Sequence, residues 1–140
     1  MKRLHLSVGV DDLDASIRFY AALFGTGPAV VKDDYAKWML DDPRVNFVVT
    51  TDAPATGVNH LGIQAEDEAE LDEVYARVAA AGGATLDEGE TECCYARSTK
   101  QWIVDPTGVP WEAFLTHGEA HGDAPIRSPE TVEARGGCCA

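Results

Sequence analysis

The chain contains one structural unit twice, and this repeat constrains its fold more than any other feature. Each copy opens with alternating apolar and polar residues, at 4–10 and again at 60–65, which is the pattern of a strand with one packed face. A helical pattern with an apolar stripe follows each opening strand and stops at a glycine, Gly25 or Gly82. Further strand-like segments follow the two helices at 29–32, 35–40, 45–50, 84–86, 95–97, 101–104 and 111–116.

This repeat, with a period of about 55 residues, predicts an α+β fold. Two βαβββ modules, at about residues 1–55 and 58–117, are expected to form one curved mixed β-sheet in a single domain of residues 1–117. Helices should cover the convex face, which leaves the concave face as a ligand cavity. Residues 118–140 lack a sustained apolar pattern, so we expect them to form a flexible, cysteine-containing C-terminal tail.

The composition argues against several classes of partner. A net charge of -13 at pH 7 repels the phosphates of nucleic acids and of anionic lipids. The sequence lacks an apolar run near the roughly 18 to 20 residues that a membrane span needs, and it begins with a strand pattern rather than a signal peptide. The four cysteines form two adjacent pairs, unlike a secreted disulfide framework. We therefore expect a cytoplasmic monomer or homodimer that binds neither nucleic acid nor membrane.

Two histidines occupy equivalent positions in the two modules. His5 and His60 each lie on the polar face of an opening strand, opposite the apolar residues that should pack on a helix. A single strand histidine is more often a satisfied polar residue than a ligand. Because the two positions are equivalent, however, alternation predicts that both side chains enter the same cavity.

The adjacent pair Cys93-Cys94 indicates thiol chemistry. Neighbouring Cα atoms lie about 3.8 Å apart, below the roughly 4.4 to 6.8 Å of an ordinary disulfide, so a bond between the two would be strained. Two thiolates suit a soft centre such as trivalent arsenic, cadmium or mercury. The simpler interpretation is that these are two small core side chains. Because strand neighbours point to opposite faces, joint binding needs an irregular backbone, and the acidic residues 88–92 are expected to form such a loop.

The paired modules with His5, His60 and Glu112 resemble the vicinal oxygen chelate superfamily, which includes glyoxalases, bleomycin resistance proteins and extradiol dioxygenases. The resemblance covers residues 1–117 and implies a curved sheet around a metal-binding cavity. A narrower resemblance, to organoarsenical carbon-arsenic lyases and the related cadmium-induced proteins, rests on Thr91-Glu92-Cys93-Cys94-Tyr95-Ala96, Lys100, Trp102, Asp105-Pro106 and Pro110-Trp111-Glu112. The second cysteine pair, Cys138-Cys139, is also similar to what such proteins carry.

The resemblance implies a metal site made of His5, His60 and Glu112. Alternation places Glu112 on the face of Phe114, although a strand carboxylate can also simply point at water. Two histidines and one carboxylate leave coordination positions open and suit non-haem Fe(II). The implied activity is an Fe(II)- and dioxygen-dependent lyase that breaks the carbon-arsenic bond of trivalent organoarsenicals such as methylarsenite and releases arsenite.

In that interpretation Cys93 and Cys94 bind the arsenic as a dithiolate. The pair Cys138-Cys139 is either incidental or an accessory arm that captures or delivers the substrate. A rival interpretation is a binding protein that sequesters cadmium or another soft cation without turnover, and it uses the same thiols. A third, an isomerase or thiol transferase of the glyoxalase type, needs the metal but not the thiol pair, so Cys93-Cys94 argues against it.

Overall fold

A computed structural model describes residues 1–93 and 96–119. The first module contains β1 (Arg3–Gly9), α1 (Leu13–Phe24), β2 (Val30–Lys32), β3 (Tyr35–Asp41) and β4 (Arg44–Thr50). The second contains β5 (Gly57–Ala65), α2 (Glu68–Ala81), β6 (Thr85–Cys93), β7 (Ala96–Val104) and β8 (Pro110–Glu119). Both modules have the order βαβββ, which confirms the predicted α+β class and its repeat.

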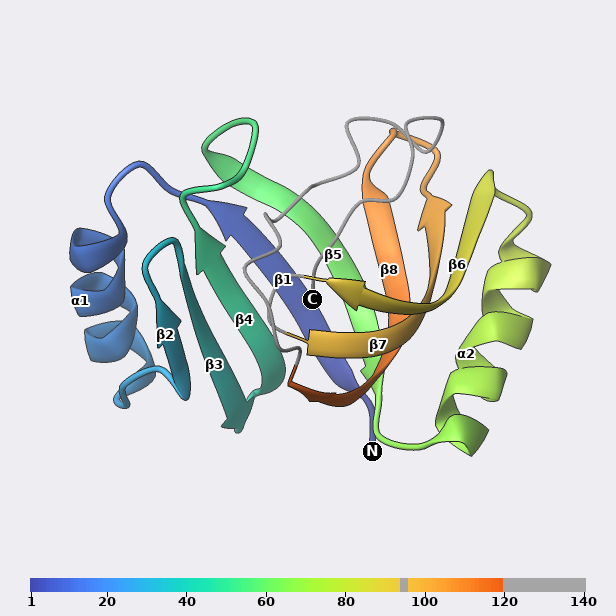
Figure 1. Ribbon diagram of the computed structural model, residues 1–140. Helices are drawn as coiled ribbons and strands as arrows, with labels where there is room; N and C mark the ends of the chain where they lie inside the picture. Colours follow the sequence, from blue (N-terminus) through green and yellow to red (C-terminus); the bar gives the residue numbers. More distant parts are fainter. Residues whose placement is uncertain (94–95, 120–140) are drawn as a thin grey trace.

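The strands form one 8-stranded sheet in the order β2-β3-β4-β1-β5-β8-β7-β6. The opening strands β1 and β5 lie side by side in its centre and run antiparallel, and each is parallel to the last strand of its own module. Figure 1 shows α1 and α2 at opposite ends of the molecule, with the curved sheet between them. The two opening strands, and with them His5 and His60, therefore meet where the modules join.

The two helices begin and end in the same way. Asp12 precedes α1 and its carboxylate accepts a hydrogen bond from the backbone N–H of Ala15, while Asp67 plays the same part for α2. Caps of this kind stabilise a helix by about 1 kcal/mol each. At the other end, Gly25 and Gly82 adopt φ angles of 70° and 72°, a left-handed conformation that glycine takes without steric cost. Both glycine stops agree with the sequence prediction.

Apolar side chains fill the space between each helix and the sheet. In module one, Tyr20 and Phe24 of α1 pack on Trp38 and Phe47, with 4.6 Å between the ring centroids of Tyr20 and Phe47. In module two, buried side chains of α2, β5 and β8 form two clusters, made of Leu71, Ala65 and Leu115 and of Val74, Val78 and Ala113. Because one face of the sheet carries this core, the polar residues of the same strands lie on the opposite, concave face.

The segment 88–92 is not a loop, so that expectation was wrong. It belongs to β6 and pairs with β7, for example Glu90 with Thr99. Two short strands were expected at 95–97 and 101–104, but residues 96–97 and 101–104 belong to the single strand β7, and residue 95 lies outside the described part of the chain. Glycine and glutamate are poor strand formers, but pairing with a neighbouring strand overrides that preference. The glycine is accommodated by a register shift between Asp87 and Gly89, where Gly89 adopts a φ of 60°.

Some expectations fall outside the described part of the chain. Cys94 and the pair Cys138-Cys139 lie outside it, as does the expected tail apart from its first positions, Gly118 and Glu119, which belong to β8. Cys93 is described only as the last backbone position of β6, paired with Ala96. Within the described residues, neither helix has the length and apolarity needed to cross a bilayer.

Candidate metal centre

A single row of residues across five strands forms the floor of the concave face. The register places Asn46 of β4 opposite His5 of β1, His5 opposite Gly62 of β5, Gly62 opposite Glu112 of β8, and Glu112 opposite Trp102 of β7. Residues directly opposite one another on paired strands point to the same face of a sheet. The row therefore brings His5 and Glu112 together although they lie 107 positions apart in the sequence.

The three residues predicted to bind metal converge at this row: His5 and Glu112 belong to it, and His60 lies beside it. His60 lies two positions before Gly62 on β5 and on the same face, and its Nε2 is 3.1 Å from Nε2 of His5. Oε2 of Glu112 lies 3.8 Å from the His5 Nε2 and 3.5 Å from the His60 Nε2. All three side chains are buried, and one donor atom from each lies within 4.8 Å of the others. The convergence agrees with the sequence analysis, and metal binding by the three stays a prediction.

Gly62 makes room for two of these side chains. A Cβ atom at this position would lie 2.6 Å from the carbonyl oxygen of Glu112 and 3.3 Å from Cδ2 of His5. The first distance is shorter than van der Waals contact, and the atom involved is backbone. A side chain here would therefore push β5 and β8 apart at the candidate metal ligands.

We expect Gly62→Ala to weaken metal binding and to lower the free energy of unfolding by about 1–3 kcal/mol, as overpacking of a tight site usually does. Gly27→Ala is the matched control, because a Cβ at Gly27 meets no atom within 4 Å. Urea denaturation and a metal titration of both variants check this. Equal stability and affinity in the two variants would show that the row tolerates a side chain at position 62.

The rings of the two histidines are held by neighbouring groups. Nδ1 of His5 donates to the backbone carbonyl of Asn46 at 3.1 Å, so in the neutral ring Nε2 carries the free lone pair. Phe114 packs edge-on against His5, with ring centroids 5.3 Å apart, and Trp102 packs in the same way against His60 at 5.1 Å. Hydrogen bonding of the second ring nitrogen and close packing are what orient metal-binding histidines in proteins.

The charges at the site put the donor groups in their metal-binding forms. Burial alone would raise the pKa of Glu112, but Lys100, followed by His60 and His5, outweighs burial and lowers that pKa to about 2. Burial, followed by the neighbouring His60, lowers the pKa of His5 to about 3. At neutral pH the site therefore presents a carboxylate and a neutral imidazole, which are the forms that coordinate metal ions. The residues present fit a divalent transition metal.

Lys100 is a site residue that the sequence analysis did not place. Its side chain is fully buried, and its Nζ lies 2.7 Å from Oε1 of Glu112. The predicted strand began at residue 101, so alternation was not applied to position 100. In the structure β7 is continuous through Lys100, and Lys100 shares the concave face with Trp102 two positions later. The alternation of Lys100 with Trp102 was therefore present in the sequence. It could be used only if one strand continued through position 100, where the sequence analysis expected a break.

The pKa shifts predict how the stability of the metal-free protein depends on pH. Between about pH 6.5 and 3 the unfolded chain protonates His5 while the native state does not, so stability falls as the pH falls. Glu112 adds a second loss between 4.5 and about 2, because its native carboxylate resists protonation. Each group contributes a slope of about 1.4 kcal/mol per pH unit inside its window.

Urea denaturation of the metal-free protein between pH 7 and 5 tests the His5 contribution. We expect His5→Gln to remove about 1.4 kcal/mol per pH unit from the slope below pH 6.5, because glutamine does not titrate. Stability curves that stay parallel in the two proteins across this range would contradict the lowered pKa of His5.

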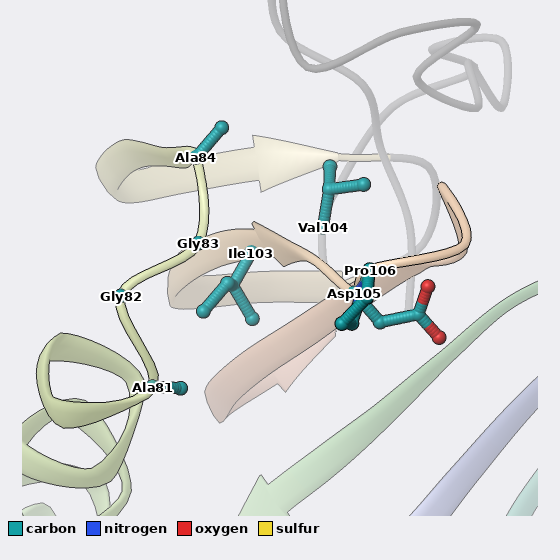
Figure 2. Close-up of a pocket in the computed structure, with 8 residues that line it drawn as sticks. All are labelled: Ala81, Gly82, Gly83, Ala84, Ile103, Val104, Asp105 and Pro106. Atoms are coloured by element: carbon teal, nitrogen blue, oxygen red, sulfur yellow. The ribbon is translucent and has the colours of Figure 1, made fainter.

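A separate cavity of about 510 Å³ lies at the end of α2, away from the three candidate ligands. Figure 2 shows it between the Gly82-Gly83 turn and the end of β7. Its lining is mostly apolar, and the carboxylate of its one ionisable lining residue, Asp105, accepts hydrogen bonds from Thr107 and Val109 in the adjoining turn. One oxygen of that carboxylate is thus already engaged by the adjoining turn.

Two βαβββ modules joined at their opening strands, with a His-His-Glu cluster on the shared concave face, are typical of a class of metal-binding proteins. The model of the Glyoxalase/Bleomycin resistance protein/Dioxygenase superfamily matches residues 2–113, and the chain belongs to this family. The resemblance noted in the sequence is therefore confirmed. A Mn(II)-bound glyoxalase from Novosphingobium aromaticivorans shares the fold, with a TM-score of 0.60 and 20% identity over 92% of this chain and 44% of that one.

Relatives of higher identity carry two different names. A protein from Thermomonospora curvata named trivalent organoarsenical cleaving enzyme is 42% identical over 122 residues, which cover 86% of this chain and 81% of the relative. The cadmium-induced protein CadI from Mycobacterium bovis is 36% identical over 143 aligned positions, which cover 99% of this chain and 93% of the relative. Both groups are those that the sequence string around Cys93-Cys94 resembles.

Proposed function

We propose that this protein is an Fe(II)- and dioxygen-dependent lyase that breaks the carbon-arsenic bond of trivalent organoarsenicals such as methylarsenite and releases arsenite. The observation that carries the proposal is the buried cluster of His5, His60 and Glu112, in a chain whose 42%-identical relative is named an organoarsenical cleaving enzyme. The substrates would be the trivalent organoarsenical and dioxygen. The protein would act in the cytoplasm as a monomer or homodimer.

The donor set supports iron as the cofactor. Two imidazoles and one carboxylate leave coordination positions open, and this composition is typical of non-haem Fe(II) enzymes that use dioxygen. Bound Fe(II) would supply the one-electron chemistry that dioxygen requires. The protein residues would hold that ion in a fixed place: Asn46 orients the ring of His5, and Lys100 holds the carboxylate of Glu112. Burial of all three donors would limit the access of bulk water.

Cys93 and Cys94 would bind the substrate. Trivalent arsenic is thiophilic, and two thiolates would hold it through two bonds, which fixes the orientation of the remaining carbon-arsenic bond. The backbone of Cys93 pairs with Ala96, where β6 ends and β7 begins, and in the view of Figure 1 this part of the two strands lies in front of β1 and β5. Cys138 and Cys139 would serve only as accessory thiols for capture or delivery.

The decisive experiment follows arsenic speciation over time. Protein is loaded anaerobically with Fe(II), mixed with excess methylarsenite, and then exposed to dioxygen. We expect arsenite to accumulate beyond one equivalent per protein, and only when both iron and dioxygen are present. Methylarsenite that stays bound and chemically unchanged under these conditions would rule out the lyase.

Sequestration of a soft cation is the second candidate function, and the 36%-identical CadI relative favours it. In that case the thiols would hold cadmium, and the His-His-Glu cluster would not need to support turnover. Isothermal titration with Cd(II), carried out alongside the speciation assay, separates the two. Tight thiol-dependent cadmium binding without arsenite formation would select the binding protein over the enzyme.

A further inference from the structure

Lys100 places a positively charged ammonium group at the candidate metal centre, beside the position of a metal cation that it would repel. Its side chain is fully buried on the concave face of β7, and its Nζ lies 6.0 Å from the centre of the Trp102 ring. Lysine is seldom buried without a paired charge. Its partner is Glu112 on the neighbouring strand β8, at 2.7 Å, in an ion pair rather than a directed hydrogen bond.

The ion pair divides the two carboxylate oxygens of Glu112 between different neighbours. Oε1 lies against the ammonium group of Lys100, whereas Oε2 faces the Nε2 atoms of His5 and His60 at 3.8 and 3.5 Å. A lysine ammonium is a compact charge that can hold a single oxygen. An arginine guanidinium would instead pair with both oxygens through its planar fork.

The register explains the direction from which Lys100 reaches Oε1 of Glu112. Trp102 lies directly opposite Glu112, while Lys100 lies opposite Phe114, one step further along the same face. Lys100 and Glu112 are thus diagonal neighbours, a separation of about 7–8 Å between backbones that a long side chain can bridge. The ammonium group therefore approaches the carboxylate from the side of Phe114 rather than from the position directly opposite it.

We propose that Lys100 is a positioning residue that occupies one oxygen of Glu112 and so makes Glu112 a one-oxygen ligand. The inference rests on the metal centre of the proposed function and deepens it. With Oε1 engaged, only Oε2 is available to an ion held by His5 and His60. A coordination position that a two-oxygen carboxylate would fill then stays open for other ligands.

Charge alone predicts the opposite effect of removing Lys100. A positive group next to a cation site repels the cation, so its loss should strengthen the binding of a divalent ion if charge were its only role. Loss of a group that orients a metal ligand, in contrast, commonly weakens metal binding about 10- to 100-fold. The sign of the change in affinity therefore separates the two roles.

Cobalt(II) binding to the full-length, metal-free protein tests the inference, because the visible absorption of Co(II) weakens as its coordination number rises. We expect Lys100→Met to bind Co(II) about 10- to 100-fold more weakly than wild type and to give weaker bands, since both oxygens of Glu112 become available. Lys100→Arg keeps the charge but engages both oxygens, and should lose a similar factor in affinity. Lys32→Met, which removes a lysine from the exposed strand β2, should match wild type.

Unchanged or tighter Co(II) binding by Lys100→Met would overturn the inference, as would Co(II) bands of unchanged intensity in that variant or a wild-type protein that binds no Co(II). Methionine preserves the buried volume and arginine preserves the charge, so if one variant lacks a cooperative melting transition the other decides. A different result would contradict the proposed activity. If the Lys100 variants differ from wild type as expected but the wild-type protein does not cleave methylarsenite, the inference about Lys100 stands and the proposed lyase activity is wrong.

Discussion

His60→Ala and Glu112→Ala are each expected to abolish cleavage of methylarsenite while arsenic binding to the thiols stays largely intact. Each change removes one of three donors that converge within 4.8 Å, so the remaining pair should hold iron poorly. The loss should exceed the roughly 10- to 100-fold that changes outside the ligand set cause. Arsenite formation by iron-loaded protein and methylarsenite binding to metal-free protein are measured on the same preparations.

Folding must be controlled separately, because Glu112→Ala leaves Lys100 buried without its partner. Breaking a buried ion pair from one side costs about 3–5 kcal/mol. Glu112→Gln keeps an oxygen for Lys100 and should retain the melting transition, while an uncharged amide remains a poor replacement for the ligand. His117→Ala, which removes an exposed histidine of β8, is the matched control and should be active. Loss of arsenic binding together with turnover would point to misfolding or to a shared site.

Cys93→Ser and Cys94→Ser should each lose most of the activity while iron binding survives. A hydroxyl is a hard, weak ligand for trivalent arsenic, and the remaining thiolate cannot chelate alone. Steady-state arsenite formation and iron content, measured for both single variants, check this. If the two cysteines serve only core packing, Cys94→Ser should lower the melting temperature and leave turnover by the folded fraction normal.

The terminal pair supplies the control for the thiols. Cys138→Ser and Cys139→Ser should have little effect in a dilute assay with abundant substrate, because an accessory arm can raise only capture or delivery. Activity that persists in the Cys93/Cys94 double variant but vanishes without the terminal pair would reverse the assignment of the substrate thiols.

Much of the fold could be predicted because its signals are local. Period-two alternation identified the opening strands of both modules and the faces of His5 and His60, and glycines marked the C-terminal ends of both helices. The prediction of a loop at 88–92 was wrong because the structure of this segment depends on a neighbouring strand. Its glycine and glutamates read locally as a loop, and only pairing with β7 makes it a strand.

The candidate site shows the same division. Alternation states which face of a strand a residue occupies, and for His5 and His60 that local rule was sufficient to predict the concave face. For Glu112 alternation gave only the face of Phe114, and the family resemblance was needed to predict its place in the site. It does not state which strands become neighbours. Gly62 between His5 and Glu112, and Lys100 on one oxygen of that carboxylate, follow from the pairing of β1, β5, β8 and β7. The sequence alone determined the faces, whereas the tertiary structure decided the neighbours, because strand register depends on contacts between residues far apart in the chain.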